Sequence, residues 1–300
     1  MRPAEQGFLL LSSHLGDPER KILTAPQLRT LAKRAKLLPR EDRDLNEADL
    51  LNLGYDRTMA RRILELLDGE SQLSWYLSRG KRSGCVPVTR VSEDYPHRLR
   101  LRMGLDAPGC LWAKGDLSLL RRPAVSLVGS RELKEANRLF AEEAGRQAAL
   151  QGYVLVSGNA KGADRQAQEA CLASGGSVIS VVADELETKP LIPGVLWLSE
   201  DGFDLSFSTP RALSRNRVIH SLGAVTLVAQ CSLGKGGTWD GTVKNLRCNW
   251  SPVFCYEDAT LAMAELIQMG AVSVKPEDLR DFAALRGNNI SWTQLCESEI

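Results

Sequence analysis

The first eighty residues carry apolar positions at helical spacing and lack the alternation typical of strands. A capping box at Thr24 starts a helix that runs to about Leu37, Asn46 starts a short second helix, and Asp56 caps a third. The apolar stripes of these helices must pack on one another. Residues 1–82 are therefore predicted to form a small all-helical domain.

Beyond residue 123, short apolar runs alternate with amphipathic segments. Residues 80–123 are punctuated by glycines and prolines, which predicts a connector with room for one short strand. The alternation after it predicts βαβ units, hence an α/β, Rossmann-like parallel sheet with helices on both faces over residues 83–270. Residues 271–300 are left as a C-terminal tail. Strands are expected at 124–128, 153–156, 177–183, 195–199, 224–230 and 252–256, and helices at about 133–150, 162–174, 211–221, 238–246 and 259–269.

Composition changes this picture little. The 38 Lys and Arg residues nearly balance the 37 Asp and Glu residues, so any nucleic-acid site must be a local basic patch. The 7 cysteines are odd in number and contain no C-x-x-C pair, which favours a reduced, cytoplasmic protein. We expect no metal site and no cofactor, because the 3 histidines are scattered, and we expect neither a membrane segment nor a secretion signal.

The stretch 125–164 contains two strand-loop-helix units in succession, with small residues in both loops. The first loop has the sequence GSR over 129–131, and the second has SGNAKGAD over 157–164. Loops of this kind direct backbone N–H groups and a helix N-terminus at one point, which suits a phosphate. The alternatives are a plain turn with a surface arginine and, for Asp164, helix capping alone.

Two later segments are expected at the same edge of the sheet. Arg211, Arg215 and Arg217 gather near the start of a predicted helix, which indicates an anion-binding cluster, with solvated charge as the alternative. Residues 234–238, GKGGT, form a fourth loop, and no loop pairs a nucleophile with a base, so no catalytic site is predicted. The predicted DNA- or phosphate-binding residues are Gly129, Ser130, Arg131, Ser157, Gly158, Lys161, Gly162, Arg215, Asn216, Arg217, Lys235, Gly236, Gly237 and Thr238.

These motifs, in this order, resemble those of the DNA-processing protein A (DprA/Smf) family. The matching segments are 95–115, 128–131 (V-G-S-R), 157–164 (S-G-x-A-x-G-x-D), 199–200 (S-E) and 215–219 (R-N-R-h-I). The resemblance implies a Rossmann-like domain that binds single-stranded DNA and helps to load a RecA-type recombinase. It also implies a homodimer and no catalysis. Binding through phosphates would tolerate any sequence and weaken with salt.

The chain departs from the family pattern at the predicted ligand edge. Gln168 stands where the family has a histidine, and Ala212 where it has an aromatic, a stacking role that the nearby Phe207 could take. A nucleotide-sensing module of the same superfamily is therefore the alternative function. A phosphoribohydrolase is less favoured, because Asn245 stands where its loop carries the catalytic glutamate. The residues after Gly270 are too few for the winged-helix domain that many members append.

Residues 53–63, LGYDRTMARRI, distantly resemble a helix-hairpin-helix nucleic-acid module, with Asp56 in place of the second hairpin glycine. We favour a plain helical bundle in which Arg57, Arg61 and Arg62 form a solvated face. A DNA-contacting hairpin and a partner-docking surface are the alternatives.

Overall fold

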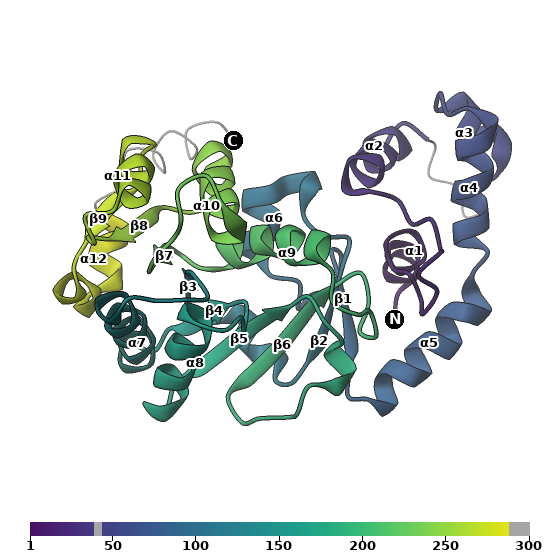
Figure 1. Ribbon diagram of the computed structural model, residues 1–300. Coiled ribbons are helices and arrows are strands. Elements are labelled where there is room, and N and C mark those ends of the chain that lie inside the picture. The colour runs from purple at the N-terminus through teal and green to yellow at the C-terminus, as the bar shows by residue number, and fades with distance from the viewer. Residues whose placement is uncertain (39–43, 288–300) are drawn as a thin grey trace.

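The structure is a computed structural model that describes residues 1–38 and 44–287 (Figure 1). Five helices open the chain, which confirms its all-helical character, although only three of the five were predicted individually. Three of them begin where expected, at Thr24, Asn46 and Asp56, whose side chains accept hydrogen bonds from amides of the first helical turn. The five helices are α1 (Pro3–Ser12), α2 (Ala25–Ala35), α3 (Glu47–Asn52), α4 (Arg57–Leu67) and α5 (Glu70–Arg82).

A nine-stranded sheet with the order β1-β2-β6-β5-β4-β3-β7-β8-β9 forms the centre of the rest of the molecule. All six strands predicted beyond residue 123 are present, and each pairs in parallel with its neighbours from β6 across to β9. The Rossmann-like prediction is thus confirmed. The strands are β1 (Val86–Thr89), β2 (Cys110–Lys114), β3 (Ala124–Val128), β4 (Val154–Ser157), β5 (Ser177–Val182), β6 (Val195–Glu200), β7 (Thr226–Val228), β8 (Val253–Tyr256) and β9 (Val272–Val274).

Two segments hold more structure than predicted. The connector carries two strands, β1 and β2, which pair antiparallel with each other, while β2 pairs antiparallel with β6. The expectation of one short strand was wrong because these runs of four and five residues lie between glycines and prolines and show no clear period. The segment expected to be a tail adds β9 to the sheet and the helix α12 (Phe282–Gly287). Its last part, 288–300, lies outside the described residues.

Helices cover both faces of the sheet (Figure 1). On one face α7 and α8 share a core with β3, β4 and β5, and the N-terminal helices α1 and α5 continue that core around β2. On the other face α6, α9 and α11 pack on the sheet with partly buried residues of α10. The remaining helices are α6 (His97–Met103), α7 (Glu135–Leu150), α8 (Ala163–Ala173), α9 (Thr209–Leu222), α10 (Gly236–Cys248) and α11 (Leu261–Gln268), and the 3-10 turns are Gly104–Asp106, Leu117–Arg121, Leu186–Thr188 and Pro276–Arg280.

Within the described residues, no helix combines the length and the apolar character that crossing a membrane requires. The same residues include no group of three or more His, Cys, Asp or Glu side chains placed to hold a metal ion.

Candidate nucleic-acid interface

The direction of strand addition reverses between β3 and β7. From β3 the chain adds β4, β5 and β6 on one side, and then β7, β8 and β9 on the other. In open α/β sheets ligands bind beyond the carboxyl ends of the strands at such a reversal. A cavity of about 360 Å³ lies there, lined by the loops after β3 and β7 and by the first half of α9.

The loop after β3 is fixed by its neighbours and presents one charged side chain to the cavity. The Ser130 amide donates to the Gln230 carbonyl over 2.9 Å, and Thr238 Oγ1 donates to the Gly129 carbonyl over 2.9 Å. Arg131 follows, exposed and lining the cavity, with no hydrogen bond or ion pair of its side chain in the described part of the chain. The sequence-predicted trio 129–131 therefore lies at the site, with Arg131 as its available cation.

The loop after β4 is closed by the protein itself. The buried Asp164 carboxylate accepts hydrogen bonds from the amides of Gly158 and Ala160, at 3.0 and 3.2 Å. The Ala163 amide donates to the Ser130 carbonyl over 3.1 Å, and a Cβ at Gly162 would lie 2.4 Å from that same oxygen. Three amides of the loop predicted to bind a phosphate are thus already paired within the protein, and Ala160 and Asp164 of this loop line the cavity. Its Lys161 is exposed but does not line the cavity.

Arg215 is a buried brace rather than a free phosphate ligand. Its guanidinium donates to the carbonyls of Gly158 and Val181, at the ends of β4 and β5. A Cβ at Gly158 would lie 2.1 Å from that guanidinium, so glycine is required there. Burial raises the pKa of Asp164, and the charge of Arg215 beside it opposes that rise. The two groups leave little net charge in the cavity floor.

The other two arginines of the predicted cluster are also held by the protein. Arg217, itself half-buried, forms an ion pair with the buried Glu200, with 2.7 Å between Nη2 and Oε2, and donates to the Asp106 carbonyl. It lines a different hollow, on the other side of α9. Arg211 donates to the carbonyls of Ala183, Leu205 and Ser206. Because their donors meet backbone carbonyls and a carboxylate, neither arginine serves the predicted anion cluster.

The fourth predicted loop contributes most directly to the cavity. Lys235, Gly236, Gly237 and Thr238 all line it, and Lys235 is exposed with no ion pair among the described residues. Asn216 also lines the cavity and donates from Nδ2 to the Gly237 carbonyl over 2.9 Å. This contact ties the start of α10 to α9.

An aromatic ring completes the cavity rim. Phe207 is 56% exposed, and beside it Leu213 is 44% exposed. Ala212 also lines the cavity but has no ring. Phe207 is therefore the nearby residue that offers a ring for stacking. Leu213 was not predicted, because one exposed apolar residue on a helix carries no distinctive signal.

Two residues at which the chain departs from the patterns of related proteins are buried. Gln168 donates to the side chains of Ser157 and Ser180 in the interior between β4, β5 and α8, so neither it nor Ser157 touches a ligand. Asn245 is fully buried, where its Nδ2 lies 3.1 Å from His220 Nδ1 and its Oδ1 accepts the Ser251 amide. Asn245 therefore holds buried polar groups together and cannot act on a substrate as a catalytic glutamate would.

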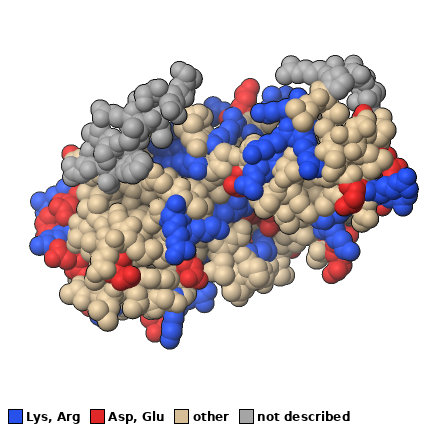
Figure 2. All heavy atoms as spheres, turned by 90° about the horizontal axis from the view of Figure 1, so that it is seen from above, with Lys and Arg blue, Asp and Glu red and all other residues tan. Residues whose placement is uncertain are grey.

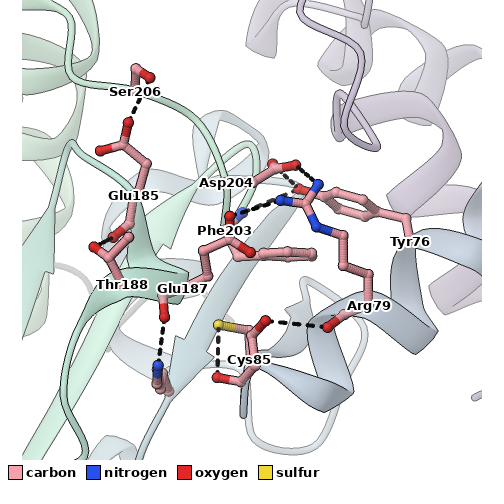
Figure 3. Close-up of polar contacts among 11 residues, drawn as sticks. Tyr76, Arg79, Cys85, Glu185, Glu187, Thr188, Phe203, Asp204 and Ser206 are labelled. Atoms are coloured by element: carbon pink, nitrogen blue, oxygen red, sulfur yellow. Dashed lines mark hydrogen bonds and ion pairs between the residues drawn. The ribbon is translucent and has the colours of Figure 1, made fainter.

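The loop that carries Phe207 is anchored at its other end to the N-terminal helices (Figure 3). Arg79 of α5 pairs with Asp204 and Glu187, at 2.6 and 2.7 Å, and the Tyr76 hydroxyl donates to Asp204. The Tyr76 ring stacks on Phe203 with 4.3 Å between centroids. Sequence reasoning missed this contact because α5 and the loop lie more than a hundred residues apart.

Basic side chains cluster in the middle of one face of the molecule (Figure 2). Figure 2 shows Lys and Arg side chains across the middle of the face seen from above, whereas most acidic side chains lie nearer its edges. A near-neutral total of +1 therefore conceals a local positive field, the arrangement by which proteins attract a polyanion.

Known proteins are similar to this chain in sequence and in fold. The chain is 35% identical over 148 residues to DNA processing protein DprA of Streptococcus pneumoniae, an alignment that spans 44% of this chain and 50% of that protein. It is 32% identical over 163 residues to Protein Smf of Escherichia coli, which spans 48% and 41% of the two chains. The chain thus matches half or less of the length of these curated relatives.

Two solved structures have the same architecture. The crystal structure of DNA processing protein A from Streptococcus pneumoniae superposes with a TM-score of 0.73 at 24% identity, covering 93% of this chain and 98% of the other. A structure of DNA processing protein A from Helicobacter pylori, described by its single-stranded DNA binding mode, gives a TM-score of 0.56 at 23% identity, covering 68% and 96%. The family described as DNA recombination-mediator protein A matches residues 87–283, well over half of the chain, and the protein belongs to that family.

Proposed function

We propose that this protein binds single-stranded DNA at the carboxyl edge of its sheet and performs no catalysis there. The observation that carries the proposal is the cavity rim, where Arg131 and Lys235 have no ion pair among the described residues and Phe207 offers an exposed ring. The cations would hold phosphates and the ring would stack on a base, which is the sequence-tolerant mode of single-strand binding.

Family membership supports three further parts of the proposal. We propose that the protein acts in the cytoplasm as a homodimer and passes its single strand to a RecA-type recombinase. Light scattering coupled to size-exclusion chromatography tests the dimer. Recombinase loading is tested by measuring filament growth on DNA coated with single-strand-binding protein, with and without this protein.

Titration of labelled oligo-dT across a range of salt concentrations tests DNA binding. We expect Arg131→Ala to weaken binding by about tenfold, since a charged hydrogen bond contributes roughly 1.5 kcal/mol. Phe207→Ala should weaken binding by about five- to 150-fold, because stacking contributes about 1–3 kcal/mol per base. Arg280→Ala is the matched control, because Arg280 is exposed and follows Leu279, which contacts the far end of α7.

A small-nucleotide sensor is the second candidate, because a cavity of about 360 Å³ is large enough for a mononucleotide. The same titrations separate the two functions. If mononucleotides compete with oligo-dT at equal concentration of binding units, the cavity is a nucleotide site and the DNA proposal fails.

A further inference from the structure

A basic hollow on the N-terminal helices lies apart from the cavity described above. Its volume is about 740 Å³, and it opens between the segment 19–21 and helix α4. Five cations line it, namely Arg20, Lys21, Arg57, Arg61 and Arg62, against two carboxylates, Glu19 and Glu65. Positive charge is therefore in local excess here, although the chain as a whole is nearly neutral.

Two of the five cations build the hollow. Arg20 donates to the carbonyls of Leu10 and Leu66, at 3.1 and 2.8 Å. Arg62 donates to the carbonyls of Lys21 and Ile22, at 2.8 and 2.6 Å. These bonds hold the segment 20–22 against α4, which fixes the backbone of Lys21 in the wall of the hollow.

The other three cations, Lys21, Arg57 and Arg61, are exposed. Arg57 and Arg61 are four residues apart on α4 and so share one face of the helix, with their Cβ atoms about 5–6 Å apart. The one ion pair found for these three side chains within the described residues joins Arg61 to Glu47 over 3.9 Å, with both side chains largely in solvent. An ion pair of this kind is weak and does not neutralise the group.

The hairpin between α3 and α4 has several of its backbone donors occupied by the protein itself. Its amides, those of Leu53, Gly54 and Tyr55, donate to carbonyls of α3 at 2.9–3.1 Å. A phosphate held on hairpin amides would need these donors unpaired. Three amides of the hairpin are therefore already paired, and the exposed side chains beside it supply the charged donors of the hollow.

We propose that this hollow is a second nucleic-acid contact, in which Lys21, Arg57 and Arg61 hold backbone phosphates. The choice of single-stranded DNA as the source of those phosphates rests on the proposed function of the cavity. A single strand of DNA that is bound at the cavity and is long enough to reach the hollow would then be bound at two sites. Two linked contacts bind more tightly than either alone.

The test compares short and long oligo-dT on the full chain by fluorescence anisotropy at several salt concentrations. The triple variant Lys21→Ala, Arg57→Ala, Arg61→Ala should bind long oligo-dT about tenfold more weakly and short oligo-dT unchanged. The slope of log affinity against log salt should fall by about 2, since each single-strand phosphate contact contributes about 0.7. Arg82→Ala, Arg247→Ala, Arg280→Ala removes the same charge from exposed positions elsewhere and should bind as the wild type does.

A second variant separates charge from structure. Lys21→Arg, Arg57→Lys, Arg61→Lys keeps the charge and should restore binding. The proposal is overturned if the alanine triple binds long oligo-dT with the wild-type salt slope, or if the matched control loses affinity equally. The double variant Arg131→Ala, Lys235→Ala separates the two proposals. If it leaves the affinity for oligo-dT intact while the alanine triple lowers it, the cavity proposal fails and the proposal for the hollow is supported. The reverse result supports the cavity alone.

Discussion

Helices α4 and α9 both begin with arginines four residues apart, Arg57 and Arg61 in one and Arg211 and Arg215 in the other. In α9 both side chains turn inward and donate to backbone carbonyls at the ends of strands and loops. In α4 both remain in solvent beside a hollow. The same charge spacing therefore stabilises a fold in one helix and leaves cations available to a ligand in the other.

The arginines of the two helices differ because the first turns of α9 and α4 pack against different surroundings. The first turns of α9 pack beside the carboxyl ends of parallel strands, where carbonyl groups leave the sheet ladder and need donors. Helix α4 starts on the surface of a small helical bundle, where Arg62 already donates to the nearby carbonyls of Lys21 and Ile22. An arginine pattern predicts binding only where no unpaired backbone lies within its reach.

Arg215→Ala should have the largest effect on stability. Removing the guanidinium leaves the carbonyls of Gly158 and Val181 without their buried donor and Asp164 without its nearby cation. Each buried acceptor left without a partner costs about 1–3 kcal/mol, so the free energy of unfolding should fall by about 2–6 kcal/mol. Urea unfolding followed by circular dichroism measures it. A loss below about 1 kcal/mol, the size expected of an ordinary substitution, would show that Arg215 is not a structural brace.

The buried side of α9 should also make stability depend on pH. Burial lowers the pKa of His220 from 6.5 to about 3. Between these two pH values the unfolded chain binds more protons at His220 than the folded chain does. The contribution of neutral His220 to the free energy of unfolding is therefore fully present above pH 6.5 and is lost as the pH falls below it. Between about pH 6.5 and 5 the loss is roughly 1.5 kcal/mol.

Urea unfolding at these two pH values tests this, with His220→Gln as the comparison. The difference in the free energy of unfolding between the wild type and the variant should change by roughly 1.5 kcal/mol between the two pH values, even if the variant is less stable overall. Asp201 opposes the trend below pH 6, because burial and the neighbouring Glu200 raise its pKa to about 6 and its protonated form favours the folded state. A wild-type slope that equals the variant's slope would contradict the role of His220.

The smallest effect is expected in α4. Arg57→Ala removes an exposed side chain, so the free energy of unfolding should stay within about 0.5 kcal/mol of the wild type. The same denaturation experiment measures it beside Arg215→Ala. A loss as large as that of Arg215→Ala would remove the distinction between the two helices, and the hollow would have to be regarded as structural.

Period and capping were sufficient to predict eight of the helices and the six central strands of the sheet, whereas α1, α5, α6 and α12 were not predicted. The six central strands are continuous β-branched and leucine-rich runs between amphipathic helices, and such runs have few other interpretations. The second strand of the connector and β9 were missed because strands of three to five residues carry too few positions to show a period.

The location of the site could be predicted from the sequence, but the contacts of its charged side chains could not. Loop positions follow from strand ends, so Arg131 and Lys235 were correctly brought to one edge. The orientation of a long side chain does not follow from its position, because Arg215 and Arg217 could face either solvent or backbone. Only tertiary packing decides between these, and it buries Arg215 and holds the half-buried Arg217 in an ion pair.

The aromatic contact beneath the Phe207 loop has a consequence for how the chain can be divided. Trp112 and Phe203 are both fully buried, and each packs against Tyr76 of α5, with ring centroids 5.1 and 4.3 Å apart. A fragment that begins after α5 would expose both rings to water, at a cost of several kcal/mol. We therefore expect the helical segment and the sheet to unfold in one cooperative transition. Isolating the sheet as a soluble fragment would require polar residues in place of these two aromatics.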